Sequence, residues 1–162
     1  IELQQMRFGE KISYHVTVSD DSLLYCLIPK LTIEMLVENA VGHGIEPKEG
    51  IGTVQVSISC AAPETLKIVI ADDGVGFEGK NGEIPLPLDL PAAGNRHNRI
   101  ALNTVYKMLH HLYGSKYGIH ISSFENVGTT VTILLPKEDS RNVQNSDSGR
   151  RDLDAKGPLH ID

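Results

Sequence analysis

Cysteine and positive charge are both scarce in this chain, and each scarcity excludes a class of protein. Only two cysteines are present, and Cys26 and Cys60 lack the CxxC spacing of a zinc site. We therefore expect two buried free thiols in a reducing compartment, and no disulfide framework. Lys and Arg number 15 against 21 Asp and Glu, which gives a net charge of −6. Because no basic cluster offsets that charge, we expect no binding of nucleic acid.

Long apolar runs are missing as well. No stretch approaches the length that crosses a membrane, and no charged start followed by an apolar run indicates a signal peptide. The 162 residues and a hydrophobic content of 40% predict one globular domain with a real core. Since the chain opens with Ile1 rather than Met, we interpret it as a fragment, with a membrane segment or a partner domain expected upstream.

The stretch LTIEMLVENAVGHGI, Leu31 to Ile45, is predicted to be an amphipathic helix that begins at Pro29 and ends within Gly42 to Gly44. Its apolar stripe, which includes Leu31, also carries Asn39 and His43. A buried Asn costs about 1–3 kcal/mol while its groups stay unpaired, so Asn39 needs a partner from the protein, from water or from a ligand.

Two carboxylates, Glu34 and Glu38, occupy a neighbouring face of the same helix. Together with the amide and the imidazole they are suited to hold a hydrated cation and the phosphates that it bridges. The alternative is an ordinary core amide whose groups are satisfied within the protein, which is the more frequent situation for an isolated Asn.

Alternating and apolar segments predict most of the remaining elements. The expected strands are Ile12–Val18, Thr53–Ser59, Leu66–Ala71, Tyr117–Phe124 and Thr129–Leu135, and the expected second helix is Arg99–Tyr113. The Gly- and Pro-rich segment Glu78–Asn98 has no repeating apolar face, so we expect an irregular lid that is mobile without a ligand. We divide the chain into the end of a connecting helix (1–10), a domain (11–136) and a disordered tail (137–162).

Two further motifs lie at strand ends. In DDGVG, residues 72–76, the carboxylate of Asp72 can accept hydrogen bonds from an exocyclic amine, and Gly74 and Gly76 let the backbone approach a flat base or a phosphate. In VGTTV, the hydroxyl of Thr129 could hold the same base directly or through water. Taken singly, each motif is also an ordinary turn.

In this order, ENAVGHG, DDGVGF, a Gly-rich lid with a helix ending in LYG, and GTTVTILLP resemble the N box and glycine boxes of one ATPase fold. It is the fold shared by gyrase, the Hsp90 chaperone, histidine kinases and the mismatch-repair protein MutL. Within it, RFGEKISYHV and IPKLTIEMLVENAVGHGI are most similar to the catalytic domain of LytS-like sensor histidine kinases. The resemblance covers Gln4 to Pro136 and implies an α/β (α+β) Bergerat fold, a two-layer sandwich whose mixed β-sheet is covered on one face by helices.

The resemblance also implies roles for the residues that match. Asn39 matches the residue that holds Mg²⁺ between the ATP phosphates, and Glu38 matches the acid proposed to assist the transfer. Asp72 matches the residue that recognises the adenine amine. The other matches are Gly74 and Gly76 lining the base, Thr129 behind it, and His43 closing the N box.

For the whole protein, the resemblance implies transfer of the γ-phosphoryl group of ATP to a histidine outside this chain. The implied partners are an upstream phosphoacceptor helix domain and a response regulator. The full-length protein is expected to be a membrane-anchored homodimer with this domain in the cytoplasm.

The chain departs from the family pattern at three places. Gly42 stands where a phosphate-reaching Lys is common, Arg99 and Ala101 stand at the two glycine positions of the second glycine box, and Thr104 replaces its Asn. Those glycines give backbone N–H groups access to phosphate at a helix N-terminus, so Arg99 could either bind phosphate or block its approach. A non-catalytic or nucleotide-weak interaction module of the same fold is therefore an alternative interpretation. A stand-alone ATPase or serine kinase of this fold is a third, which the expected connecting helix at residues 1–10 disfavours.

Overall fold

The computed structural model describes residues 11–88, 96–138 and 156–158, with residues 96–99 and 156–158 described as backbone. The predicted helix end at 1–10 lies outside the described residues, as does the predicted disorder of 139–155 and 159–162. None of the described helices is both long and apolar enough to cross a membrane.

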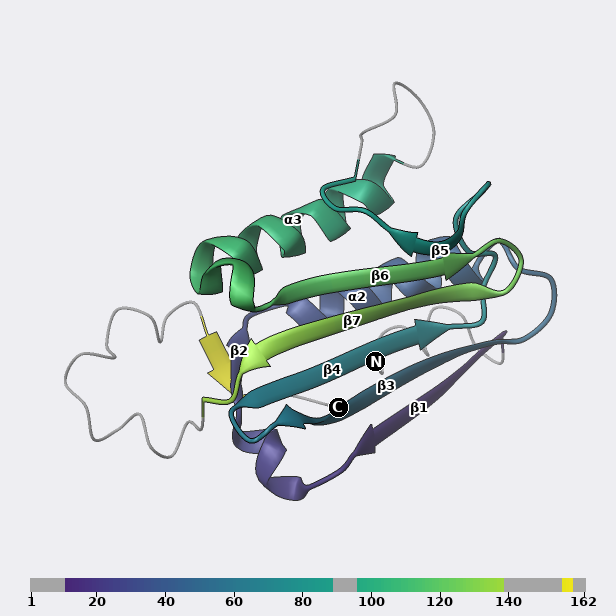
Figure 1. Cartoon of the computed structure of the whole chain (residues 1–162). Coiled ribbons are helices and arrows are strands. Elements are labelled where there is room, and N and C mark those ends of the chain that lie inside the picture. Colours follow the sequence, from purple (N-terminus) through teal and green to yellow (C-terminus); the bar gives the residue numbers. More distant parts are fainter. Residues whose placement is uncertain (1–10, 89–95, 139–155, 159–162) are drawn as a thin grey trace.

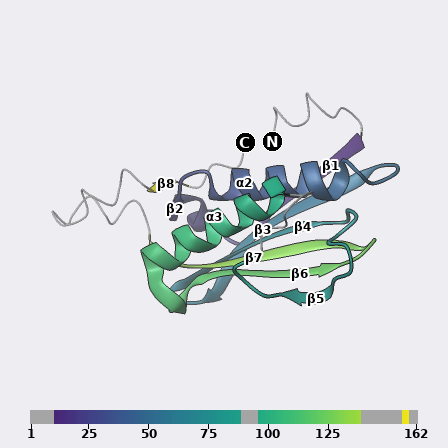
Figure 2. The same cartoon turned by 90° about the horizontal axis from the view of Figure 1, so that it is seen from above.

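Six strands form one mixed sheet in the order β1-β3-β4-β7-β6-β5. In that order the strands are Ile12–Val18, Gly52–Ala62, Thr65–Asp72, Gly128–Pro136, Gly118–Phe124 and Asn81–Ile84. The pair β1 and β3 is parallel and every other pair is antiparallel. The helices α2 (Thr32–Asn39) and α3 (Arg96–Tyr113) lie on one face of this sheet (Figures 1 and 2), which confirms the predicted two-layer sandwich.

The core lies between the sheet and the two helices. Strand residues of one parity point toward the helices, and the register sets them side by side, as in the row Val56, Ile70 and Val131. Each fully buried aliphatic side chain stabilises the fold by about 1.5–3 kcal/mol relative to exposure. From the helices, α2 contributes Leu36 and α3 contributes Leu102 and Leu109 to this core, all of them buried.

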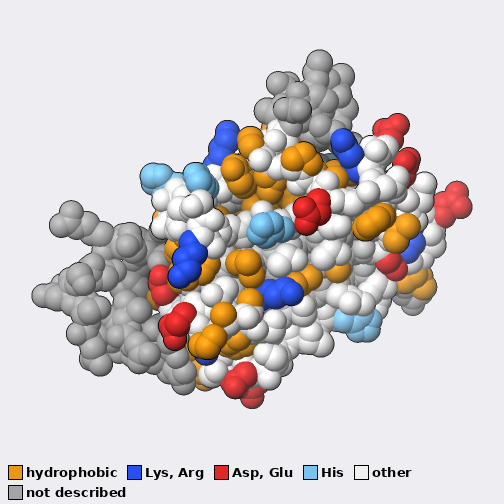
Figure 3. Space-filling model, in the orientation of Figure 1, with side chains coloured by type: hydrophobic (Ala, Val, Ile, Leu, Met, Phe, Trp, Pro, Cys, Tyr) orange, Lys and Arg blue, Asp and Glu red, His pale blue; other side chains and the backbone are white. Residues whose placement is uncertain are grey.

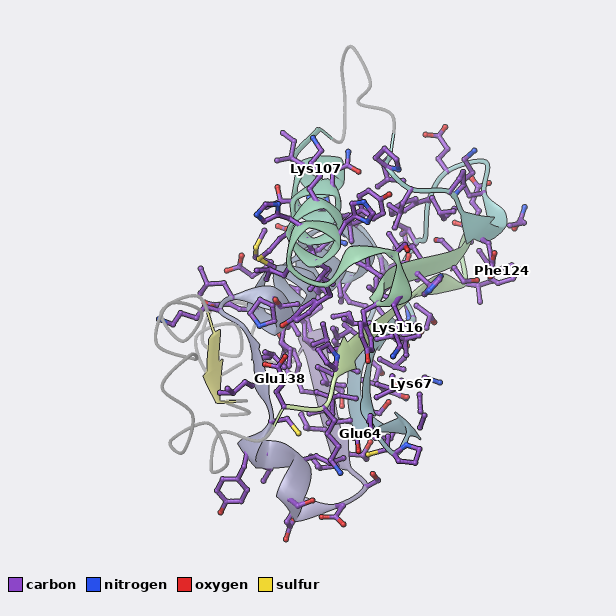
Figure 4. All side chains as sticks on the ribbon, turned by 60° about the vertical axis from the view of Figure 1, so that its left-hand side comes forward. Glu64, Lys67, Lys107, Lys116, Phe124 and Glu138 are labelled. Carbon is purple, nitrogen blue, oxygen red and sulfur yellow. The ribbon has the colours of Figure 1, made fainter. Side chains whose placement is uncertain are left out.

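The opposite face of the sheet is open and carries few charges in the view of Figure 3. Lys67 and Phe124 project from this side, whereas Lys107 lies on α3, on the other side of the sheet (Figure 4). The open face follows from the same two-residue period, because residues next to buried ones point away from the helices.

Shorter elements connect these layers. They are the 3₁₀ helix η2 (Asp21–Tyr25), the strand β2 (Leu27–Pro29), the π-helical segment η3 (Ala40–Ile45), the 3₁₀ turn η4 (Gly114–Lys116) and the strand β8 (Lys156–Pro158). β8 pairs with β2 and is a strand that the sequence did not predict.

The predicted start of the first helix was wrong. Pro29 is the buried end of β2, and its carbonyl oxygen accepts a hydrogen bond of 2.8 Å from the hydroxyl of Thr32. Leu31, expected in the core, instead turns the chain with a φ of 64° and is 63% exposed. The turn between strand and helix therefore uses Leu31, and α2 begins at Thr32.

The predicted irregular lid, Glu78–Asn98, was also partly wrong. β5 adds to the edge of the sheet through pairing with β6, Ile84 and Leu88 are buried, and α3 begins at Arg96 instead of Arg99. A four-residue strand is ordered by its neighbour in the sheet rather than by its own pattern. Mobility of the lid stays a prediction, because residues 89–95 are outside the described part.

Of the two cysteine predictions, the one for Cys26 is confirmed and the one for Cys60 is wrong. Cys26 is buried and free, as expected, but Cys60 is free and exposed. Cys60 has the same parity as the buried Ile58, yet the pairing of β3 with β4 shifts between Cys60 and Ala62, and the last residues of β3 are exposed. Parity no longer decides burial at this irregular hairpin end.

Candidate functional site

Four segments contribute to the candidate site; the first three lie at the right-hand end of the molecule in Figure 1, and the fourth, in α3, lies at the top. They are the end of α2 with η3, the exit of β4, the hairpin between β6 and β7, and the first half of α3. The candidate binding residues lie on these segments, so the fold brings together residues that are up to 91 positions apart, from Glu38 to Thr129.

A pocket of about 260 Å³ lies between the two helices. Its lining consists of Met35, Glu38, Asn39 and His43 from α2 and η3, and Ala101 from α3. Asn39 is 8% exposed, which confirms the prediction that its amide faces the interior. Among the described residues its Oδ1 has no hydrogen-bond partner.

An unpaired buried acceptor costs about 1–3 kcal/mol, so Asn39 Oδ1 is set up to receive a donor or a cation. The exposed carboxylate of Glu38 lines the same pocket. Oxygen atoms of this kind suit Mg²⁺, which keeps several waters and takes one or two ligands from protein. No cluster of three or more His, Cys, Asp or Glu exists in the described part of the chain, so an ion here would share its shell with water and a bound anion.

Asp72 ends β4, directly opposite Thr129 of β7. Its Oδ1 accepts a hydrogen bond of 2.9 Å from the backbone N–H of Gly74. Burial raises the pKa of Asp72 to about 6, against the opposing effect of backbone hydrogen bonds from Gly74 and Thr129. This carboxylate therefore titrates much closer to neutrality than an ordinary aspartate.

The neighbouring Asp73 behaves in the opposite way. Its Oδ1 accepts hydrogen bonds from the backbone N–H of Thr53 at 2.8 Å and from Lys48 Nζ at 2.9 Å. Partial burial acts to raise the pKa of Asp73, but the Thr53 and Lys48 hydrogen bonds and the Lys48 charge hold it below its ordinary value. Asp73 thus links the loop after η3 to the sheet through Lys48 and Thr53, whereas the more buried Asp72 forms no ion pair with that loop in the described part of the chain.

Gly44 joins the pocket to the strand exit. A Cβ built on Gly44 would lie 2.5 Å from Asp72 Oδ1, and a Cβ on Gly74 would overlap the backbone of Gly44. The carbonyl oxygen of Gly44 accepts a hydrogen bond of 3.0 Å from the N–H of Val75. Only glycine at both positions permits this contact. The sequence analysis missed Gly44, although its place two residues after Gly42 in GHG was visible.

The helix changes type immediately after Asn39. η3 is π-helical, and the N–H of Glu46 bonds to the carbonyl oxygen of Val41 at 2.8 Å. Such turns are rare and often lie at functional positions. The sequence predicted a helix here, but it did not predict the wider π-helical turn that places Gly44 next to Asp72.

Behind Asp72, Thr129 is buried and contacts a residue that the sequence analysis missed. Ser123, which is fully buried, lies 2.9 Å from it, hydroxyl to hydroxyl. Gly76, with a φ of 67°, has no room for a side chain because a Cβ would overlap the carbonyl oxygen of Phe124. The signal for Ser123 was its parity, since Ile119 and Ile121 of the same strand are buried.

The first half of α3 carries two of the three departures from the family pattern, and the third, Gly42, lies in η3. Ala101 lines the pocket, and Thr104 is exposed and donates to the carbonyl oxygen of Ile100 at 2.7 Å. The side chain of Arg99 is outside the described part, so its role stays a prediction. At Gly42 a Cβ would meet nothing within 4 Å.

Asn103, which the sequence analysis missed, is buried, and its side-chain amide forms hydrogen bonds with both the N–H and the carbonyl oxygen of Leu88. It accepts from the Leu88 N–H at 2.7 Å and donates to the Leu88 carbonyl oxygen at 2.8 Å. These two hydrogen bonds attach Leu88, in the segment after β5, to α3.

Residues 29–139 match the family described as histidine kinase-, DNA gyrase B-, and HSP90-like ATPase. The chain is 34% identical over 138 residues to the sensor histidine kinase YpdA of Escherichia coli and 32% identical over 143 residues to the sensor protein LytS of Oceanobacillus iheyensis. These matches cover 85% and 88% of this chain but only 22% and 24% of the relatives. The chain thus spans less than a quarter of the length of each relative.

Solved structures share the fold. The catalytic domain of the histidine kinase ThkA superposes with a TM-score of 0.56 at 14% identity, covering 85% of this chain and 86% of that domain. The blue-light activated histidine kinase of Erythrobacter litoralis EL346 gives 0.55 at 22% identity, covering 87% and 40%. At these identities the likeness is one of architecture.

Proposed function

The chain belongs to the histidine kinase-, DNA gyrase B-, and HSP90-like ATPase family, and on that premise we propose that it is the ATP-binding catalytic domain of a two-component sensor histidine kinase. In this function the γ-phosphoryl group of ATP passes to a histidine outside this chain, on an upstream helical domain, and from there to a response regulator. Homodimer formation and a membrane anchor for the whole protein stay predictions.

The observation that carries the proposal is the unpaired Oδ1 of Asn39 in the pocket between α2 and α3. We assign to it a ligand position on Mg²⁺, which when bound neutralises charge on the phosphates. Glu38, exposed in the same pocket, would assist the transfer as an acid–base group. His43 lines the pocket and would contact the phosphates, together with Arg99 from the start of α3.

At the other end of the site, we assign the adenine amine to the carboxylate of Asp72. Gly74 and Gly76 would let the base lie against the backbone, and Thr129 would contact it from behind. The support for this assignment is the geometry at Gly44, which holds the base end and the phosphate end on one continuous helical segment.

A second candidate is an interaction module of the same fold that binds nucleotide weakly or not at all. The observation that favours it is Ala101, which lines the pocket at a position where the family has a glycine. A methyl group there can obstruct the approach of phosphate to the helix N-terminus.

Titration calorimetry with a non-hydrolysable ATP analogue, with and without Mg²⁺, tests the proposal. We expect the parent to bind more tightly with Mg²⁺, and Asn39→Ala to lose that gain while retaining the magnesium-free affinity. Asn81→Ala, at an exposed position in β5, is the control and should behave as the parent. Absence of binding by the folded parent at millimolar analogue would refute the proposal and favour the interaction module instead.

A further inference from the structure

We propose that Ser123 is a positioning residue for the base: it fixes the Thr129 hydroxyl and the turn at Gly76 and Phe77, and thereby sets the preference of the site for adenine. The inference rests on the proposed ATP function and adds a residue to it. It starts from the one fully buried hydroxyl of the hairpin that faces the exit of β4.

Ser123 is 0% exposed and connects three segments. Its Oγ accepts a hydrogen bond of 2.9 Å from the backbone N–H of Phe77 in the loop after β4. It donates toward the carbonyl oxygen of Gly128 at 3.2 Å and lies 2.9 Å from Thr129 Oγ1. One small side chain thus fastens the glycine turn to the strand that carries the proposed base contact.

The hydrogen bonds of Ser123 determine the direction in which the Thr129 hydroxyl points its proton. A serine hydroxyl has one proton and two lone pairs, and the N–H of Phe77 occupies one lone pair. When the Ser123 proton points to Gly128, the second lone pair receives the Thr129 proton. Thr129 then presents a lone pair to the outside, which suits a donor such as an exocyclic amine.

The same contact bears on Asp72. Thr129 lies directly opposite Asp72 in the sheet register, and its backbone N–H acts to lower the pKa of the Asp72 carboxyl. A shift of Thr129 therefore moves its own hydroxyl, which is one acceptor. It also moves the strand next to Asp72, whose carboxylate is the second acceptor. Because both acceptors would face the same amine, the loss of Ser123 is expected to reduce discrimination at that amine more than general affinity.

ATP and inosine triphosphate are the probes, because they differ at position 6 of the base, where an amine is replaced by an oxygen. We expect the parent to prefer ATP, and Ser123→Ala to bind ATP about tenfold more weakly and to lose about fivefold in the ratio of the two affinities, since two buried donors lose their acceptor. The gain in affinity from Mg²⁺ should remain that of the parent. Ser123→Cys, whose sulfur is a weaker acceptor than the hydroxyl oxygen, should give an intermediate ratio.

Ser122→Ala is the matched control, because Ser122 is the preceding residue on the same strand and points to the open face. It should leave both affinities unchanged. A double-mutant cycle sharpens the test: in a Thr129→Val background, Ser123→Ala should cause no further loss in the ratio.

Three results would overturn the inference. An unchanged ratio in folded Ser123→Ala, with both affinities lowered by one common factor, would show that Ser123 only supports the fold. Full additivity in the cycle would show that it does not act through Thr129. A parent that binds ATP but shows no preference over inosine triphosphate would remove base selection from this site, while a parent that binds neither would overturn the proposed function itself.

Discussion

Replacement of Asp72 by Asn is predicted to stabilise the ligand-free protein at neutral pH while it weakens nucleotide binding. The raised pKa of about 6, against an ordinary value of 3.8, means that the folded protein holds the proton more tightly than the unfolded chain does. Asp72 therefore favours folding below pH 3.8, and this contribution is lost as the pH rises through about 6. At pH 7 the ionised carboxylate is a net burden on stability.

The magnitude follows from the shift. About two pKa units correspond to at most about 3 kcal/mol. Asn keeps an acceptor for the Gly74 N–H but loses charge-assisted acceptance from Thr129, which removes about 1–1.5 kcal/mol. The net gain in the free energy of unfolding is about 1–2 kcal/mol at pH 7, or about 3–6 °C in Tm for a chain of this size. Loss of the amine contact should weaken ATP binding about ten- to a hundredfold.

Thermal unfolding of parent and Asp72→Asn between pH 4.5 and 7.5 measures the first effect, and calorimetry with the ATP analogue measures the second. The difference in Tm should shrink toward pH 4.5, where the parent carboxyl is already neutral. Asp73→Asn is the control of opposite sign, since its pKa is lowered and its carboxylate pairs with Lys48, so it should lower Tm at pH 7. A Tm for Asp72→Asn at or below that of the parent at pH 7 would refute the reasoning.

Three other substitutions probe the surroundings. Asn39→Ala should leave Tm unchanged or raise it, in contrast to an ordinary buried amide, because its Oδ1 has no partner to lose; a fall of several degrees in thermal unfolding would contradict this. Gly44→Ala should cost about 1–3 kcal/mol in denaturant unfolding through overlap with Asp72, whereas the control Gly42→Ala has open space and should be neutral or stabilising. Asn103→Ala should cost about 1–3 kcal/mol and speed amide hydrogen exchange at Leu86 and Leu88, and unchanged exchange would show that these two hydrogen bonds are dispensable.

The elements that the sequence predicted well are those whose pattern is set by the core. The alternation in β4 and β7 and the apolar stripe of α3 follow directly from burial on one face, and their positions were confirmed within a few residues. β5 and β8 were not predicted, because short strands derive their order from the strand beside them.

In the candidate site, too, some residues could be predicted from the sequence and others could not. The burial of Asn39 was predictable, since a polar residue interrupted a helical stripe, and the strand exit at Asp72 followed from the motif after an apolar strand. Ser123 and Asn103 could not be assigned from sequence, because each acts on backbone groups that are distant in the chain. The pairing of Gly44 with Gly74 depends on a π-helical turn for which we found no local cause in the sequence.

The helical segment from Asn39 to Ile45 fixes the distance between the pocket and the carboxylate of Asp72. Asn39 lines the pocket and Gly44 lies against Asp72, so the short π-helical segment between them sets the distance between the two ends. That spacing cannot change unless the helix unwinds or the glycine contact opens. A ligand must therefore span a set distance to engage both ends at once, and compounds with a shortened or lengthened link between base and phosphate should reach only one of them.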